Sequence, residues 1–191
     1  MNIEDRYHYN VIRRAIVRID AADAPLSLDD LARDIGMSTS HFQKLFSKWV
    51  GVSPKRYQQY LALDHAKTLM QTKHTVMSIT DDIGLSSSGR LHDLFLRWEA
   101  MSPGEYARKG AGLEITYGWC DTPFGDTLAM ATPRGLCAVA FTDQAGREAS
   151  FNDLSARWPN ARFIENTQNI QPYIDAAING GTANLHLMGG P

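Results

Sequence analysis

The stretch that decides the fold runs from Leu28 to Tyr57 and reads LDDLARDIGMSTSHFQKLFSKWVGVSPKRY. Ser27 is a good N-cap, and an apolar stripe at helical spacing follows it: Leu28, Leu31, Ala32 and Ile35. Gly36 ends this helix, because a residue without Cβ readily adopts the left-handed conformation that stops a helix. Ser38 caps a second helix, whose apolar stripe is Phe42, Leu45, Phe46 and Trp49. Two helices joined by a glycine turn predict a helix-turn-helix.

The outer face of the second helix carries polar side chains suited to DNA. They are Thr39, Ser40, Gln43, Lys44, Ser47 and Lys48. Hydroxyls, an amide and amines can hydrogen-bond to base edges and phosphates in a major groove. Residues 38–58 contain no acidic residue, and Lys55 and Arg56 add two candidate phosphate contacts. A solvated helical face is the alternative for a charge run alone, and the helix-turn-helix context favours DNA.

The same unit occurs a second time in the chain. Ser78–Gly84 repeats the first helix and its turn, and the apolar stripe that follows is Leu91, Leu94, Phe95 and Trp98. The second recognition helix is expected at about Ser88–Trp98, where Arg90, His92 and Arg97 are the candidate DNA contacts. Gly89 weakens its first turn and Asp93 faces outward, so it is predicted to be the weaker reader. Two matched units are stronger support than one.

Two further helices complete the first half of the chain. Residues 5–21 have a helical apolar pattern and are expected to support the first unit. Ser53 and Pro54 begin a helix that runs to about Gln71, with proline at a position where its missing N–H does no harm. At 1.5 Å per residue this linker helix is about 26 Å long. It can therefore hold two recognition helices near the ~34 Å pitch of one DNA turn.

Composition limits the class of protein. The chain has 191 residues, 43% of them hydrophobic, and a net charge of −2. No apolar run approaches the ~20 residues of a membrane span, and the polar N-terminus is not a signal peptide. Cys120 and Cys137 form no metal-binding pair and indicate a reducing compartment, so a cytoplasmic location, no metal and no cofactor are expected. Residues 1–110 carry 15 Lys and Arg against 13 Asp and Glu, so the basic charge lies in the helical half.

The pattern changes after Gly110 from helical to alternating. Strands are expected at about 113–119, 127–131, 137–141, 162–164 and 185–187, with helices near 147–158 and 170–178. This order of short strands and helices predicts a small α+β domain over residues 111–191.

The first half resembles the AraC-type DNA-binding domain. The resemblance rests on Gly36 and Gly84 in the turns, on the run from Phe46 to Tyr57, and on its counterpart ending Ser102-Pro103-Gly104-Glu105-Tyr106. It covers about Val11–Lys109 and implies a mainly helical domain over 1–110. Two helix-turn-helix units, at about 26–50 and 77–99, would be joined by a long helix. It also implies double-stranded DNA as partner, with RNA polymerase as a candidate second partner.

The second half resembles the ribonuclease-like N-terminal domain of the methylated-DNA–protein-cysteine methyltransferases. The motifs are Tyr117-Gly118-Trp119, Thr122-Pro123-Phe124-Gly125, Thr132–Cys137 and Arg157-Trp158-Pro159. Together with the first half they are similar to a subgroup in which an AraC-type regulator is fused to the alkyltransferase. That family accepts the alkyl group on the cysteine of a Pro-Cys-His-Arg motif, in a catalytic domain expected to begin after the end of this chain.

No catalytic residue is therefore predicted within these 191 residues. Neither Cys120 nor Cys137 has a neighbouring histidine, and both are expected to be small buried side chains in strands. The resulting hypothesis is a sequence-specific regulator fused to part of a repair methyltransferase, inactive in alkyl transfer as it stands. Two alternatives stay open. The chain could be a piece of an active alkyltransferase, or its C-terminal domain could only bind a small ligand or partner.

Overall fold

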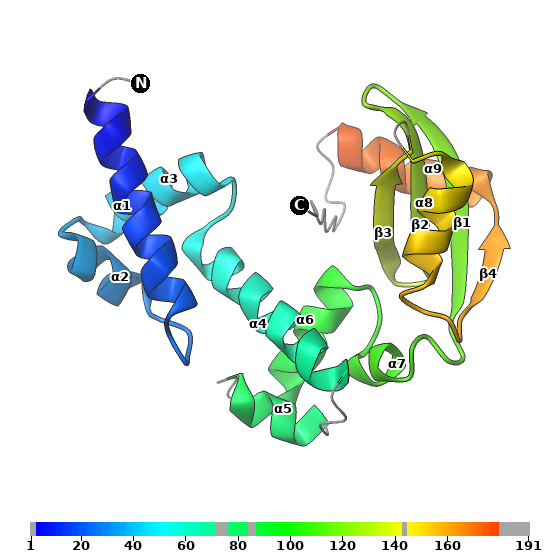
Figure 1. The fold of residues 1–191 in the computed structure, drawn as a ribbon, viewed down its shortest axis with the longest axis horizontal. Helices are drawn as coiled ribbons and strands as arrows, with labels where there is room; N and C mark the ends of the chain where they lie inside the picture. The colour runs from blue at the N-terminus through cyan, green and yellow to red at the C-terminus, as the bar shows by residue number, and fades with distance from the viewer. Residues whose placement is uncertain (1–2, 72–75, 84–86, 143–144, 180–191) are drawn as a thin grey trace. The chain divides into compact units, whose positions relative to one another are not determined.

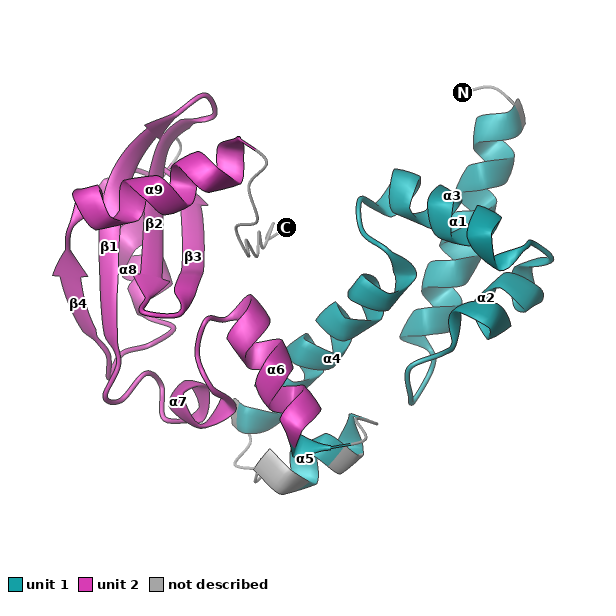
Figure 2. Cartoon of the chain, turned by 180° about the vertical axis from the view of Figure 1, so that it is seen from behind, with its two compact units in different colours: residues 1–88 teal, residues 89–191 magenta. Residues whose placement is uncertain are grey.

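The computed structural model describes residues 3–71, 76–83, 87–142 and 145–179 (Figure 1). Its helices are α1 (Ile3–Asp20), α2 (Leu28–Ile35), α3 (Thr39–Val50), α4 (Pro54–Gln71), α5 (Val76–Asp82), α6 (Ser88–Trp98), α7 (Pro103–Ala107), α8 (Arg147–Ser155) and α9 (Thr167–Ile178). Its strands are β1 (Glu114–Thr122), β2 (Gly125–Thr132), β3 (Gly135–Phe141) and β4 (Arg162–Glu165). The chain divides into two compact units, residues 1–88 and 89–191 (Figure 2). Within the described residues, no helix combines the length and apolar character needed to span a membrane.

The first helix-turn-helix begins and ends where the sequence predicts. The Ser27 hydroxyl caps α2 by accepting a hydrogen bond from the Asp30 backbone N–H at 3.0 Å. Gly36 ends the helix with φ 78° in the left-handed region, which an L-residue enters only at a cost. Ser38 caps α3 in the same way, and Gly51 ends α3 with φ 82°. The predicted helix-turn-helix geometry is confirmed over residues 28–50.

The core of the first unit forms where α1 packs on α2 and α3. Its buried side chains are Val11, Ile12, Ala15, Ile19, Leu31, Ala32, Phe42, Leu45 and Phe46. The ring centroids of Phe46 and Tyr57 lie 5.8 Å apart, so the start of α4 joins this core. The expectation that Trp49 belongs to the buried stripe is wrong, because 37% of this residue is exposed. It lies in the last turn of α3, where its ring meets His8 of α1 at the edge of the core.

Helix α4 is continuous over the predicted span and is anchored to the first helix-turn-helix. The Gln58 side-chain amide forms two hydrogen bonds with the backbone of Leu26, at 2.6 and 3.1 Å. Helix α5 lies in the same compact unit, and Ile79 within it and Ile83 directly after it are buried. Both α5 and α6 form at the predicted positions, whereas the predicted turn at Gly84 lies outside the described residues. The boundary of the DNA-binding domain at residue 110 stays a prediction.

A mixed four-stranded sheet organises the second half. Its strand order is β3-β2-β1-β4, with β1–β2 and β2–β3 antiparallel and β4 parallel to β1. Helix α8 covers one face and α9 the other, as the two opposite views show (Figures 1 and 2). Gly118 of β1 allows the close approach of α9, because a Cβ there would lie 2.6 Å from the Cα of Thr167. The α+β prediction is therefore confirmed as a sheet covered on both faces, and a ribonuclease-like fold stays a prediction.

Two element boundaries in this half differ from the sequence prediction. Helix α8 ends at Ser155 instead of Trp158, and the chain then turns so that Trp158 is 1% exposed in the core. Helix α9 begins at Thr167, three residues earlier than predicted, because the Asn166 side chain caps it by accepting from the Asn169 N–H at 3.1 Å. The predicted strand at 185–187 lies outside the described residues.

Candidate nucleic-acid interface

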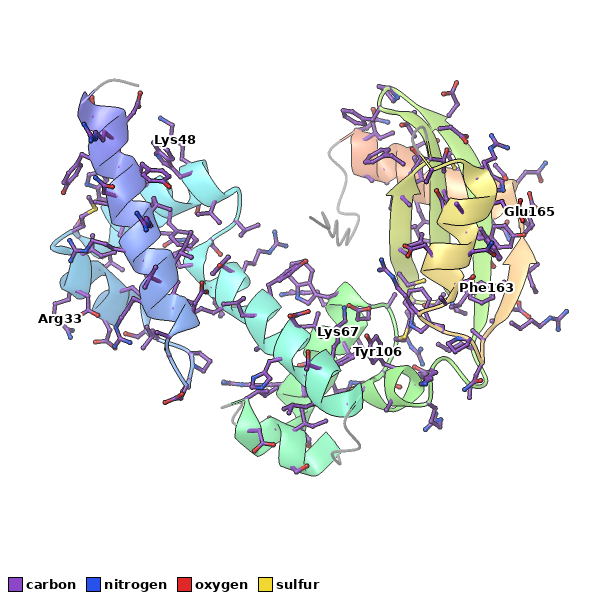
Figure 3. The ribbon with its side chains drawn as sticks, in the orientation of Figure 1. Arg33, Lys48, Lys67, Tyr106, Phe163 and Glu165 are labelled. Atoms are coloured by element: carbon purple, nitrogen blue, oxygen red, sulfur yellow. The ribbon has the colours of Figure 1, made fainter. Side chains whose placement is uncertain are left out.

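The exposed face of α3 carries the predicted DNA contacts. Ser40, Gln43, Lys44 and Lys48 are exposed, while Phe42, Leu45 and Phe46 on the opposite side of the helix are buried. Figure 3 shows the Lys48 side chain standing out from the ribbon of α3. Within the described part of the chain, neither Lys44 nor Lys48 forms an ion pair. Their ammonium groups are therefore not neutralised by a described carboxylate.

Thr39 differs from the other predicted residues of this face. It is half-buried, and its hydroxyl donates a 2.9 Å hydrogen bond to Asp29 Oδ1 in the first turn of α2. A hydroxyl has one proton to donate and two lone pairs to accept with. In this arrangement Thr39 joins the two helices and keeps only its acceptor capacity toward a base edge.

Lys55 and Arg56 lie in the first turn of α4. Both side chains are exposed, whereas Pro54 before them is buried. The Arg56 backbone N–H donates to the Ser53 hydroxyl at 3.3 Å, so the turn is capped. The N-terminus of a helix carries a partial positive charge and favours anions. Two cations added at that end make a local site suited to a phosphate group.

Helix α6 carries the predicted DNA contacts of the second helix-turn-helix. Arg90, His92 and Arg97 are exposed, and Leu91, Leu94 and Phe95 are buried. Asp93 lies on the exposed surface, as predicted, and Gly89 is exposed as well. This face therefore has fewer candidate donor side chains than α3, and a carboxylate lies among them. Whether these residues contact DNA stays a prediction, as it does for those of α3 and α4.

A basic groove lies between α1 and α2 and was not predicted from the sequence. It has a volume of about 560 Å³, and Arg13, Arg14 and Arg18 line it together with Asp34. Arg18 Nε lies 3.3 Å from Asp34 Oδ2, so one carboxylate offsets part of the charge. The signal present in the sequence was the spacing of Arg14 and Arg18, four residues apart on one helical face. The first half of the chain thus carries basic side chains on α1 as well as on α3.

Both cysteines are buried and unpaired, as predicted. Cys120 is 1% exposed and Cys137 7%. Burial and, after it, the nearby charge of Glu99 raise the pKa of the Cys137 thiol to about 12. Burial also raises the pKa of Cys120. Because the thiolate is the nucleophile in cysteine chemistry, the burial of both thiols disfavours their reactive form.

The helical half matches a known family. Residues 31–109 match the family model described as "Helix-turn-helix domain". This span contains α3, α4 and α6, and with them all ten predicted DNA contacts.

The similar proteins are regulators of transcription by name. The chain is 24% identical over 126 residues to the "Bifunctional transcriptional activator/DNA repair enzyme Ada" of Escherichia coli, covering 66% of this chain and 36% of that protein. It is 30% identical over 82 residues to the "Lactose operon transcription activator" of Staphylococcus xylosus, covering 42% and 29%. A crystal structure of an AraC-type regulator from Chromobacterium violaceum is 26% identical and covers 55% of this chain and 95% of that one, with a TM-score of 0.48.

The extent of these matches limits what they identify. The chain spans 36% of the Escherichia coli Ada protein and 40% of its Salmonella typhimurium counterpart, well under half of each. The family model covers residues 31–109, which leaves out α1, the start of α2 and the sheet. Residues 31–109 thus match a helix-turn-helix domain and lie in a chain that is similar to the Ada regulators.

Proposed function

We propose that this chain binds duplex DNA in a sequence-dependent manner and regulates transcription. The observation that carries the proposal is the exposed face of α3, where Ser40, Gln43, Lys44 and Lys48 stand on a helix whose opposite side is fixed in a core. A recognition helix needs this combination, because its polar side chains must be held rigidly at the depth of the major groove. RNA polymerase is part of the proposal as the second partner of a regulator.

Electrostatic attraction supplies the first step of binding. Lys44 and Lys48 on α3 and Lys55 and Arg56 on α4 are exposed cations, and residues 38–58 contain no acidic side chain. Each lysine or arginine that neutralises a phosphate releases a counterion, which favours binding to any sequence. This term positions the protein on the duplex without selecting a sequence.

Base readout supplies the selectivity. Gln43 lies one turn into α3 with an exposed amide that can donate and accept, and amides of this kind pair with adenine in two places. Lys44 can reach guanine, and Ser40 can bond to several bases. Arg90, His92 and Arg97 of α6 provide a second set of donors, with the carboxylate of Asp93 on the same exposed surface. The first helix-turn-helix is thus proposed to discriminate between sequences more strongly than the second helix-turn-helix.

The role proposed for residues 111–191 is that of a partner domain from an alkyltransferase fusion. The supporting features are the sequence motifs around Gly118 and the similarity to Ada, which is named as both an activator and a repair enzyme. In this proposal no described residue accepts an alkyl group. Burial of Cys120 and Cys137, with their raised pKa values, supports that assignment.

Selection of bound duplexes from a random pool tests the proposal. The purified chain should enrich a defined sequence and bind it about 10³-fold or more tightly than random duplex at physiological salt. Lys44→Glu reverses one charge in the middle of the α3 face and should abolish enrichment. Arg157→Glu is the matched control, because Arg157 is an exposed residue between α8 and β4. This variant should still enrich the same sequence. Equal binding to all sequences, or loss of enrichment in both variants, would rule the proposal out.

A further inference from the structure

The two repeats differ in the residue with positive φ that comes after each recognition helix, directly after α3 and two residues after the end of α6. In the first repeat this residue is Gly51, with φ 82° and no atom within 4 Å of the place where a Cβ would stand. In the second it is Ala100, which adopts φ 51° although an L-residue is disfavoured there. Ala100 is 3% exposed and belongs to the core that packs against the sheet. The second repeat therefore has an alanine in a backbone conformation that costs free energy. The methyl group of this alanine is packed in the core beside the sheet.

The next residues extend this packing into the sheet. Met101 is fully buried in the same cluster as Ile115, Leu128 and Trp158, whereas its counterpart Val52 is only half-buried. Tyr106 packs against the cluster, and its ring lies 5.3 Å from that of Phe95 on α6. Figure 3 shows Tyr106 in this region beside α6. A continuous set of contacts thus runs from the buried side of α6 to the core of the sheet.

Two polar contacts from the β2–β3 hairpin reinforce the packing. The Thr132 hydroxyl donates a 2.5 Å hydrogen bond to the carbonyl of Ala100. The Arg134 guanidinium donates two hydrogen bonds to the Glu105 carboxylate, at 2.9 and 3.2 Å. Glu105 also accepts from the Ser102 backbone N–H at 2.7 Å, closing the capping box of α7. A bidentate pair of this kind fixes orientation as well as distance.

The residues used for this docking occupy positions that carry cations in the first repeat. Ser53-Pro54-Lys55-Arg56 corresponds to Ser102-Pro103-Gly104-Glu105. Both candidate phosphate contacts are thus replaced, one by glycine and one by an acid that pairs with Arg134. The end of the second repeat is built to hold the sheet and not a phosphate.

We propose that Thr132 and Arg134 are positioning residues for the second recognition helix. They hold Ala100 and Glu105, and through them the end of α6, so the α+β domain sets the orientation in which Arg90, His92 and Arg97 meet DNA. The effect on DNA rests on the proposed function, whereas the effect on α6 does not.

Hydrogen exchange tests the contact to α6 without DNA. Arg134→Ala and Thr132→Val should each raise the exchange rates of the 88–98 amides by about two- to fivefold, the range expected from one half-exposed ion pair or one hydrogen bond. Arg147→Ala is the matched control. It removes another bidentate pair of the same unit, to Asp126 at 2.8 Å, that touches neither α6 nor α7. Unchanged α6 exchange in both hairpin variants, or an equal rise in the control, would overturn the proposal.

Footprinting on a selected duplex tests the consequence for DNA. Arg134→Ala should weaken protection of the half-site read by α6 by about threefold or more and leave the other half-site unchanged. Glu105→Gln keeps the capping box, and adding Arg134→Ala to it should cause little further loss. Equal weakening of both half-sites would contradict a positioning role. If the unaltered protein binds no duplex, the proposed function fails, and the exchange experiment still decides the contact between the hairpin and α6.

Discussion

Thr39 donates its hydroxyl proton to Asp29 at 2.9 Å, so the first residue of α3 is tied to the first turn of α2. The hydrogen bond spans the glycine turn and fixes the start of the recognition helix. A side chain expected to read a base therefore also has a structural role within the helix-turn-helix. Ser40, Gln43 and Lys44 follow it on the exposed surface and carry the donors of this face.

The salt dependence of binding should report the phosphate contacts one by one. Lys48→Ala should flatten the plot of log K against log salt by about 0.9, for every duplex tested, because one counterion fewer is released. Arg157→Ala removes an exposed cation between α8 and β4, away from the candidate DNA contacts, and should leave the slope unchanged. An unchanged slope for Lys48→Ala would show that Lys48 is an ordinary solvated side chain.

Neither cysteine should accept an alkyl group. Burial holds the pKa of Cys137 at about 12 and raises that of Cys120, so the thiolate population is very small at pH 7. Incubation with duplex containing methylated guanine, followed by mass spectrometry of the intact protein, should show no added methyl group. Transfer to either residue would contradict the inert assignment of these thiols.

The Glu105–Arg134 pair should give a pH-dependent stability. Burial raises the pKa of Glu105, but hydrogen bonds from Ser102 and Arg134 outweigh it and leave the pKa below its ordinary value of 4.5. Because the ionised form is favoured in the folded state, its contribution is complete above pH 4.5 and is lost as the pH falls through the lowered pKa. Glu105→Gln should cost about 1 kcal/mol or less at pH 7.

The same comparison contains its own control. The difference in unfolding free energy between the unaltered protein and Glu105→Gln should shrink as the pH falls below 4.5. Chemical denaturation at several pH values measures it. A difference that stays constant, or grows toward acid, would show that the carboxylate charge is not what the variant removes.

Gly118 should not tolerate a methyl group. A Cβ there would lie 2.6 Å from Thr167 Cα, and backbone cannot move aside as a flexible side chain does. Gly118→Ala should therefore destabilise the second unit by about 1–3 kcal/mol. Gly104→Ala is the matched control, since its Cβ would meet only the end of the Arg108 side chain at 3.4 Å. Equal unfolding free energies for the two variants would mean that α9 can shift away from β1.

Local signals determined most of the helical half. Ser27, Gly36 and Ser38 carry the information for where α2 and α3 end and begin, because capping and left-handed turns depend on single residues. The stripe of Phe42, Leu45 and Phe46 then fixes which side of α3 is buried. The candidate DNA residues of α3 follow from that orientation alone. All of them were predicted to lie on the exposed surface, and all except the half-buried Thr39 do so.

Contacts distant in sequence could not be predicted. Ala100 and Met101 have the pattern of a helix end, and nothing local shows that they pack under a sheet beginning 13 residues later. The Glu105–Arg134 pair joins residues 29 apart, and the groove lined by Arg13 and Asp34 joins two helices. Trp49 was misassigned for the same reason, because the pattern shows a stripe but not where the partner helix stops covering it.

Sequence preference in each half-site tests the central claim most directly. Duplexes selected from a random pool should contain an asymmetric site covering two adjacent major grooves, with the half-site of the first unit more constrained. Gln43→Ala should relax preference in that half-site only, by about 1–3 kcal/mol at the base it contacts. Arg90→Ala should weaken binding with less change in preference. Two equally constrained, inverted half-sites, or no change of preference in Gln43→Ala, would contradict the assignment of α3 as the principal reader of the sequence.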